Sequence, residues 1–266
     1  MIPVQEFTDV TMVVEEDSFA VITINRPERF NAFRGRTVDE LIAAFRYAWA
    51  DHRVAAVILT GAGERAFCAG GDVKERAETG SYGETESGLF EIQQLHTLMR
   101  AIPKPVIAAV NGVAVGGGHV LHVLADLSIA SSTARFGQSG PRVGSFDAGY
   151  GSAYLARVVG EKRARQIWFL LDLYDADTAE RWGLVNEVVP PDELMDKAKE
   201  YARKIASYSP TALRFLKHSF NADSDHLGGI GNVAFAGLDL FVDTDEAKEG
   251  ARAFAEKRPP DFAPFR

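Results

Sequence analysis

Short apolar runs alternate with amphipathic segments over the first 189 residues, and this alternation constrains the fold more than any other feature of the chain. Turn-forming residues bound each apolar run, as expected for a strand. The predicted strands are Thr11–Glu15, Phe19–Asn25, Val54–Thr60, Pro105–Val110, Leu127–Ala130 and Leu184–Val189. Strands separated by helices indicate an α/β core rather than a sandwich or a helical bundle.

Two helices are predicted between these strands. The first is Thr37–His52, where apolar residues recur at helical spacing and Thr37 with Glu40 forms a capping-box pattern. The second runs from about Glu86 to Arg100 and is stopped by the prolines that follow. The polar, glycine-containing segment Glu75–Gly88 predicts a mobile surface loop.

After Val189 the pattern becomes wholly helical. Pro190-Pro191 begins a charged helix that runs to Ser207, Ser209-Pro210 begins a second, and Thr244 caps a third that runs towards Arg258. The sequence therefore predicts two units, a core of residues 1–189 and a helical C-terminal subdomain of residues 190–266.

Composition excludes several classes of protein. The chain has 29 basic and 37 acidic residues, a net charge of −8, which argues against a nucleic-acid-binding surface. Its one cysteine, Cys68, excludes internal disulfides and multi-cysteine metal sites, and we expect no metal. Met1–Asp9 has no apolar signal segment, and no apolar run reaches the ~18 residues of a membrane span. We expect a cytoplasmic protein that does not bind membranes.

Two glycine-rich turns follow predicted strands. The first, Gly61–Ala66, fits the loose dinucleotide pattern G-x-G-x-x-A, but no helix opens there, and we interpret it as an ordinary turn. Further along, Gly70-Gly71 and Gly116-Gly117-Gly118 allow close backbone approach, and the second set precedes the apolar, helix-like run Val120–Leu124. One N–H from each turn would form an oxyanion hole. The alternative is that these glycines only permit close packing.

The motifs Phe67-Cys68-Ala69-Gly70-Gly71-Asp72 and Gly112-x3-Gly116-Gly117-Gly118-His119 together resemble the crotonase (enoyl-CoA hydratase/isomerase) superfamily, over nearly the whole chain. The resemblance implies an α/β spiral of ββα turns, C-terminal helices that build a homotrimer or homohexamer, and a CoA thioester substrate. It also implies that the amides of Gly71 and Gly117 hold the thioester oxygen. The residues expected to contact the acyl-CoA around these turns are Ala69, Gly70, Asp72, Val73, Val113, Val115 and Gly116.

Enoyl-CoA hydratases carry one glutamate two residues after the glycine triplet and a second twenty residues later. Here those positions hold Val120 and Gly140. Without two carboxylates to position and deprotonate water, ordinary hydration is not expected.

The stretch Gln138–Gly151 resembles the branch containing 1,4-dihydroxy-2-naphthoyl-CoA synthase and 2-oxocyclohexanecarboxyl-CoA hydrolase. In that branch the residues matching Ser145 and Asp147 belong to the active site, although a turn-forming role is the alternative. The resemblance also implies that bicarbonate replaces a carboxylate base, with Gly140 leaving room for it. The residues expected to hold bicarbonate are Gln138, Ser139, Gly140 and Trp168.

Basic and aromatic residues after the first turn favour the synthase. Lys74, Arg76 and Tyr82 fit its loop pattern, and the C-terminal match implies that Lys257 reaches the CoA phosphates. A solvated charge cluster is the alternative interpretation.

Two departures separate this chain from the branch. Val242 stands where both named enzymes have a tyrosine, and Phe30 replaces a CoA-contacting arginine of the synthase, while Asn31–Thr37 is closer to the hydrolase. The leading hypothesis is a Dieckmann-type ring closure through an enolate, with no tightly bound cofactor. The alternatives are a ring-opening β-oxoacyl-CoA hydrolase, an enoyl-CoA hydratase/isomerase and a non-catalytic CoA-binding paralogue.

Overall fold

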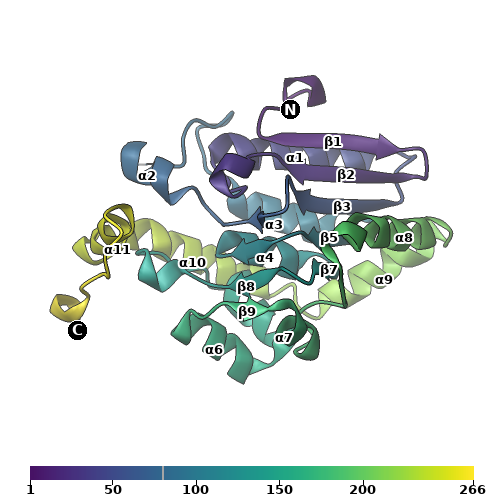
Figure 1. The fold of residues 1–266 in the computed structure, drawn as a ribbon. Helices are drawn as coiled ribbons and strands as arrows, with labels where there is room; N and C mark the ends of the chain where they lie inside the picture. Colours follow the sequence, from purple (N-terminus) through teal and green to yellow (C-terminus); the bar gives the residue numbers. More distant parts are fainter. Residues whose placement is uncertain (80) are drawn as a thin grey trace.

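Six strands form the main sheet of the computed structural model, which describes residues 1–79 and 81–266 (Figure 1). The order is β1-β2-β3-β5-β7-β10. Strands β1 and β2 are antiparallel, and all the remaining neighbouring pairs are parallel. The strands are β1 (Val10–Glu15), β2 (Phe19–Ile24), β3 (Ala56–Gly61), β5 (Val106–Val110), β7 (Leu127–Ser131) and β10 (Glu187–Val189). All six predicted strands are present, with their ends at most three residues from the predicted ones.

A second, smaller sheet has the order β4-β6-β8-β9. Its strands are β4 (Ala66–Cys68), β6 (Val113–Val115), β8 (Arg135–Gly137) and β9 (Tyr174–Asp175). Strands β4, β6 and β8 each follow a strand of the main sheet after a short turn, which gives the ββ pairs that the resemblance implies. The sequence did not predict these strands because two or three residues are too few to establish a period.

Helices cover the sheets on several sides (Figure 1). In the core region they are α1 (Gly35–Ala50), α2 (Val73–Thr79), α3 (Ile92–Ala101), α4 (Gly117–Leu124), α5 (Leu155–Val159), α6 (Glu161–Leu170) and α7 (Ala176–Arg181). Two predictions are wrong here: residues 86–91 are not helical, and α2 forms at the start of the segment predicted to be a loop. Gly80, part of that segment, lies outside the described residues.

The predicted capping box of the first helix is also wrong. Helix α1 begins at Gly35, and the Thr37 hydroxyl accepts a hydrogen bond from the Arg34 N–H at 3.2 Å. The Glu40 carboxylate, fully buried, instead accepts the backbone N–H groups of Thr8, Asp9 and Val10 at 2.8, 2.8 and 2.9 Å. Glu40 thereby fixes the chain leading into β1 rather than the end of its own helix.

The C-terminal part contains four helices within the described residues, one more than predicted. They are α8 (Leu194–Ala206), α9 (Pro210–Ala222), α10 (Leu227–Phe241) and α11 (Asp245–Ala255). Ser209 and Thr244 cap α9 and α11 as expected. Three glycines between residues 228 and 231 obscured α10 in the sequence, since glycine disfavours helix interiors.

Helix α8 packs directly on the main sheet. Its Leu194, Ala198 and Ala202 join Phe19 and Ile58 in one buried apolar cluster. Figure 1 shows α8 and α9 at one end of the molecule and α10 and α11 at the other, where α11 lies beside α2. No helix of the described chain is long and apolar enough to cross a membrane.

Three histidines are buried in the interior. His96 on α3 has no hydrogen-bond partner for either ring nitrogen among the described residues, and His119 and His122 lie on α4. Burial lowers the pKa of His96 to about 4 and that of His119 to about 3, and lowers the pKa of His122 well below its usual value.

These histidines predict a loss of stability in acid. Below pH 6.5 an unfolded histidine binds a proton that folded His96 does not bind until about pH 4, so the free energy of unfolding falls between these values. We expect His96→Leu to remove up to about 1.4 kcal/mol of this loss per pH unit. Urea unfolding at pH 7, 6 and 5 measures it, with exposed His218→Gln as control. An identical pH slope in His96→Leu and the wild type would contradict the prediction.

Candidate active site

The turn with Gly70 and Gly71 lies side by side with the turn that contains Gly116, Gly117 and Gly118, and we call the place where they meet the junction. Strand β4 pairs with β6 in parallel, with Ala66 opposite Val113 and Cys68 opposite Ala114. The pairing brings Gly70 so close to Gly117 that a β-carbon on Gly70 would lie 3.0 Å from the Gly117 nitrogen. The sequence had placed these glycines on separate turns, and the second sheet joins them.

The backbone at residue 118 is packed too closely for any residue other than glycine. A β-carbon there would lie 1.9 Å from the carbonyl oxygen of Cys68, a distance that no side chain allows. Gly70 and Gly116 have positive φ values of 87° and 59°, which also favour glycine. Close packing therefore explains why residue 118 is a glycine, and the same packing fixes the position of the neighbouring Gly117 amide.

Two backbone amides remain for a ligand at this junction. Gly71 lies opposite Phe33, but the pairing uses the Phe33 N–H to the Gly70 carbonyl and the Asp72 N–H to the Phe33 carbonyl, both 2.8 Å. The N–H of Gly71 takes no part in it. Gly117 is the first residue of α4, where an N–H has no partner within the helix and the helix dipole favours negative charge. This arrangement suits an oxyanion.

Aromatic rings cover both glycines. The Phe33 ring would lie 2.5 Å from a β-carbon on Gly117, and the Tyr82 ring 2.6 Å from one on Gly71. Tyr82 stacks on Phe90 at 4.5 Å between ring centroids, and the Arg76 guanidinium lies 5.8 Å from the Tyr82 ring. Tyr82 therefore contacts Gly71, and Arg76 lies over the outer part of this aromatic pair.

Asp72 has a different environment from the one expected of a substrate contact. It is buried and its carboxylate lies 3.1 Å from the buried Arg26 guanidinium. Arg26 also lies 3.6 Å from Asp9, which accepts a hydrogen bond from Arg34 at 2.7 Å. Asp72 thus anchors the turn to the N-terminal strands. The other expected contacts around the turns, Ala69, Val73, Val113, Val115 and Gly116, are partly exposed.

The residues expected to hold bicarbonate make contacts within the chain. A β-carbon on Gly140 would lie 2.8 Å from the Ser145 carbonyl oxygen. The Trp168 indole N–H donates to the Gly151 carbonyl at 2.6 Å. The Gln138 amide nitrogen lies 3.4 Å from a ring nitrogen of His119, and the buried Gln138 Oε1 has no hydrogen-bond partner among the described residues. Bicarbonate binding at these residues stays a prediction.

Ser139 and Ser145 connect the glycine junction to Asp147. The Ser139 hydroxyl would lie 3.5 Å from a β-carbon on Gly116, and the Ser145 backbone contacts Gly140. Asp147 follows two residues after Ser145, and its Oδ1 accepts a hydrogen bond from the Gly151 N–H at 3.1 Å. The three predicted residues therefore lie along one continuous segment, and its Ser139 faces Gly116 at the second glycine turn.

The Asp147 carboxyl has the ionisation behaviour of an acid–base group. Burial raises its pKa to about 7, and the hydrogen bond from Gly151 opposes that rise. A pKa near the working pH is the most effective value for a general acid or base. Asp147 is the one ionisable group of the predicted catalytic set, and its environment suits proton transfer.

The last two helices hold this segment from outside. A β-carbon on Gly144 would lie 2.1 Å from the Ala247 carbonyl oxygen, and one on Gly250 would lie 2.3 Å from the Gly144 nitrogen. The ring of Phe146, between Ser145 and Asp147, packs on Phe241 of α10 with centroids 5.7 Å apart. The site is therefore framed by α10 and α11.

Two predicted positions lie on these helices. Val242, the position at which the sequence departs from the branch that it resembles, is a partly buried residue that follows the last residue of α10. Lys257 is exposed just after α11, and α11 lies beside α2, which carries Lys74 (Figure 1). The C-terminal and N-terminal basic residues thus belong to neighbouring elements.

Arg65 is a residue that the sequence analysis missed. Its guanidinium lies 3.9 Å from the centroid of the Phe30 ring, so an arginine from the neighbouring turn covers Phe30. The only signal was its place in Gly61–Ala66, which we interpreted as an ordinary turn.

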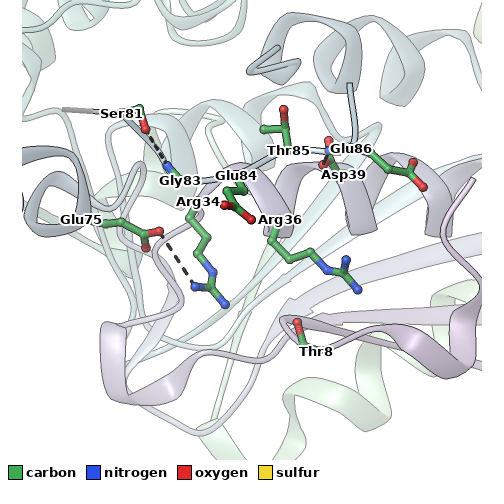
Figure 2. A pocket seen from close by; sticks show the side chains of 10 residues that line it. All are labelled: Thr8, Arg34, Arg36, Asp39, Glu75, Ser81, Gly83, Glu84, Thr85 and Glu86. Carbon is green, nitrogen blue, oxygen red and sulfur yellow. Dashed lines mark hydrogen bonds and ion pairs between the residues drawn. The ribbon is translucent and has the colours of Figure 1, made fainter. Parts of the chain in front are cut away.

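A pocket of about 760 Å³ lies next to this region, between the start of α1 and residues 81–86 (Figure 2). None of the predicted site residues lines it. Its arginines are paired with carboxylates: Arg34 with Asp9 at 2.7 Å and Arg36 with Glu40 at 2.6 Å. The charges of this pocket therefore support the fold and the N-terminal segment. Its lining is Thr8, Arg34, Arg36, Asp39, Glu75, Ser81, Gly83, Glu84, Thr85 and Glu86.

Comparison with known proteins gives one family. A family model described as enoyl-CoA hydratase/isomerase matches residues 14–264. Among solved structures, carnitinyl-CoA hydratase from Mycobacterium avium has 31% sequence identity and a TM-score of 0.83, covering 96% of this chain and 98% of that one. An enoyl-CoA hydratase from Bacillus anthracis has 33% identity and a TM-score of 0.74, with the same coverage. An enoyl-CoA hydratase from Mycobacterium avium subsp. paratuberculosis K-10 has 29% identity and a TM-score of 0.84, covering 96% and 99%.

The environment of Asp147 predicts a carboxyl that titrates near neutrality. Its folded pKa of about 7 exceeds the unfolded value, so the folded chain binds the extra proton and this stabilisation disappears as the pH rises through 7. We expect Asp147→Asn to unfold at higher urea than the wild type at pH 8, with the difference shrinking by pH 5. Infrared difference spectra of wild type and variant should show the protonated carboxyl band vanishing near pH 7. A band lost below pH 5 would contradict this.

Proposed function

The chain belongs to the enoyl-CoA hydratase/isomerase family, and from this membership we propose that it is an acyl-CoA enzyme that makes or breaks a carbon–carbon bond beside the thioester through an enolate. The observation that carries the proposal is Asp147, a half-buried residue whose carboxyl has a pKa of about 7, on the segment whose Ser139 faces the second glycine turn. Such a group can remove a proton from carbon and return it at neutral pH.

The two residues at the positions where hydratases carry glutamates argue against hydration. Val120 is fully buried in the apolar core, and the side-chain space of Gly140 is filled by the Ser145 backbone. No pair of carboxylates can position water at these two places. The hydratase names of the similar structures therefore describe those proteins, and the chemistry proposed here differs from theirs.

Ring closure is the leading reaction. The Asp147 carboxylate takes the proton α to the thioester, and the electron pair moves onto the thioester oxygen, held by the N–H groups of Gly71 and Gly117. The enolate carbon then attacks a carboxyl carbon in the same acyl group, with the Ser145 hydroxyl donating to that carboxyl. Asp147 returns its proton as water leaves. This is a Dieckmann-type condensation, most like that of 1,4-dihydroxy-2-naphthoyl-CoA synthase.

Ring opening is the alternative, because the same groups can act in reverse. Water would add to a ring ketone, the departing carbanion would be the same enolate, and Asp147 would protonate it. The sequence argument for this direction was the segment Asn31–Thr37. Its Asn31 donates to the carbonyls of Ala62 and Ala66, and Thr37 donates to Asp9. These contacts support the fold, so the segment does not favour ring opening over ring closure.

The CoA portion of the substrate would lie along the basic residues around the junction. We assign its phosphates and adenine to Lys74, Arg76, Arg65 and Lys257, and the thioester to the two amides. The proposed steps need no bound cofactor, because Asp147 can act as the base.

Copies of the chain would assemble through the C-terminal helices, as a homotrimer or homohexamer in the cytoplasm. Six large apolar side chains are exposed on α9 and α10, more than an isolated surface tolerates. They are Phe215, Leu216, Phe220, Ile230, Val233 and Leu240.

Turnover of model substrates tests the proposed function. We expect α-proton exchange on acetyl-CoA in deuterated buffer and conversion of o-succinylbenzoyl-CoA in preference to 2-oxocyclohexanecarboxyl-CoA, with crotonyl-CoA unchanged. Exchange requires only the amides and the base, so it separates an enzyme from a CoA-binding paralogue. Hydration of crotonyl-CoA, or absence of exchange by the folded protein, would overturn the proposal.

A matched pair of variants tests the amide of Gly117. Both Gly117→Ala and Gly117→Pro place a β-carbon against the Phe33 ring, but only proline removes the N–H, and proline is tolerated at the first position of a helix. We expect the proline variant to exchange the α-proton about 10²–10³ times more slowly than the alanine variant, the usual cost of losing one oxyanion donor. Equal rates in two folded variants would remove Gly117 from this role.

A further inference from the structure

Gly151 is held by hydrogen bonds on both of its backbone polar groups. Its N–H donates to Asp147 Oδ1 at 3.1 Å, and its carbonyl accepts the Trp168 indole N–H at 2.6 Å. We propose that Trp168 is a positioning residue that orients the Asp147 carboxyl through the backbone of Gly151. The proposal rests on the proposed function, in which Asp147 is the base.

Gly151 also packs directly on the carboxyl. A β-carbon there would lie 2.6 Å from Asp147 Oδ1 and 2.7 Å from Asp147 Cγ. The carboxyl therefore follows the position of the Gly151 backbone, and a change in that backbone of a few tenths of an ångström moves the base.

The turn that contains Gly151 has a carbonyl available for such a contact. Residues Tyr150–Tyr154 form one π-helical turn before α5, a rare geometry that often marks functional sites. Trp168 comes from α6, is only 9% exposed, and reaches back 17 residues to bond this turn. A buried indole N–H without a partner would be costly, so this bond fixes both the ring and the turn.

A cation holds the other side of the same turn. The guanidinium of Arg100, on α3, lies 5.5 Å from the Tyr150 ring and 4.8 Å from the Tyr154 ring, a cation–π arrangement. Arg100 also donates to the Ser224 hydroxyl at 2.9 Å. With the tyrosines fixed by Arg100 and Gly151 fixed by Trp168, the turn has little freedom to change the direction of Asp147.

Ionisable groups do not replace Trp168 in this role. The groups on the elements packed around the turn and the Asp147 segment include His96, Arg100, His119, His122, Arg142, Arg157, Asp239, Asp245, Glu246, Lys248, Glu249 and Arg252, together with the exposed charges of α6. The pKa of Asp147 responds to burial and to the Gly151 N–H rather than to any of them. The hydrogen bond from Gly151 is therefore the one polar contact that adjusts its ionisation.

Fluorine NMR tests the coupling without any activity. The chain has three tryptophans, so labelling with 5-fluorotryptophan gives three resonances, and Trp168→Phe identifies one of them. We expect the Trp168 resonance to shift with pH, with a midpoint near 7, and to lose this titration in Asp147→Asn. A Trp168 resonance that does not titrate near neutrality, or that titrates equally in Asp147→Asn, would overturn the proposal.

Kinetics of Trp168→Phe supply the second test, because phenylalanine retains an aromatic ring but has no donor. Weaker hydrogen bonding from Gly151 stabilises the carboxylate less, so we expect the acidic limb of the kcat profile to move to higher pH. We expect kcat for α-proton exchange to fall about 10-fold, part of the 10²–10⁴ that a general base contributes, with KM within about 2-fold. A wild-type profile in the folded variant would overturn the positioning role.

Two controls match these variants. Trp182→Phe removes an indole that packs on Tyr174 and Arg163, and it should leave the pH profile unchanged. Gly151→Ala, which forces a β-carbon onto Asp147, should repeat the effect of Trp168→Phe, whereas Gly229→Ala enters open space. Gly151→Ala also keeps the proposal testable if Trp168→Phe does not fold, and a wild-type profile there would overturn it.

The two tests separate this inference from the proposed function. A wild type that exchanges no α-proton while its Trp168 resonance titrates with Asp147 would overturn the proposed function and leave the coupling established. A wild type that exchanges the proton while Trp168→Phe keeps the wild-type profile would overturn the positioning role alone.

Discussion

The backbone contact between Cys68 and Gly118 is the constraint on which the candidate site depends. Two segments that each follow a strand of the main sheet approach until no β-carbon fits between them. This approach allows β4 to pair with β6 and places Gly71 and the start of α4 at one junction. The amides there are fixed by packing of the main chain, so their positions require no side-chain contacts of their own.

Much of the architecture could be predicted from the sequence, because long apolar runs report strands and spaced apolar residues report helices. The second sheet could not, since strands of two or three residues have no measurable period. Glu40 shows a different limit: the capping pattern was present, but three backbone N–H groups from the N-terminal segment bind its carboxylate. A local pattern cannot report a partner 30 residues away.

Some features of the candidate site could also be predicted from the sequence, and others could not. Glycine motifs identified the junction, and family resemblance identified Ser145 and Asp147, but neither could report what fills the space around them. The close approach of the Ser145 backbone to Gly140, for example, depends on the course of the chain between them. The acid–base character of Asp147 likewise arises from burial, which depends on how segments far apart in the chain pack together.

The packing around Gly140 also bears on how this chain could change over evolutionary time. A glutamate at that position would collide with the Ser145 backbone, and the next turn of that segment is closed by contacts of Gly144 with Ala247 and of Gly250 with Gly144. Restoring a hydratase carboxylate would therefore require the segment and the C-terminal helix to move together. A single substitution of Gly140 by glutamate would therefore strain the fold, so this route to a hydratase carboxylate is closed unless other residues change with it.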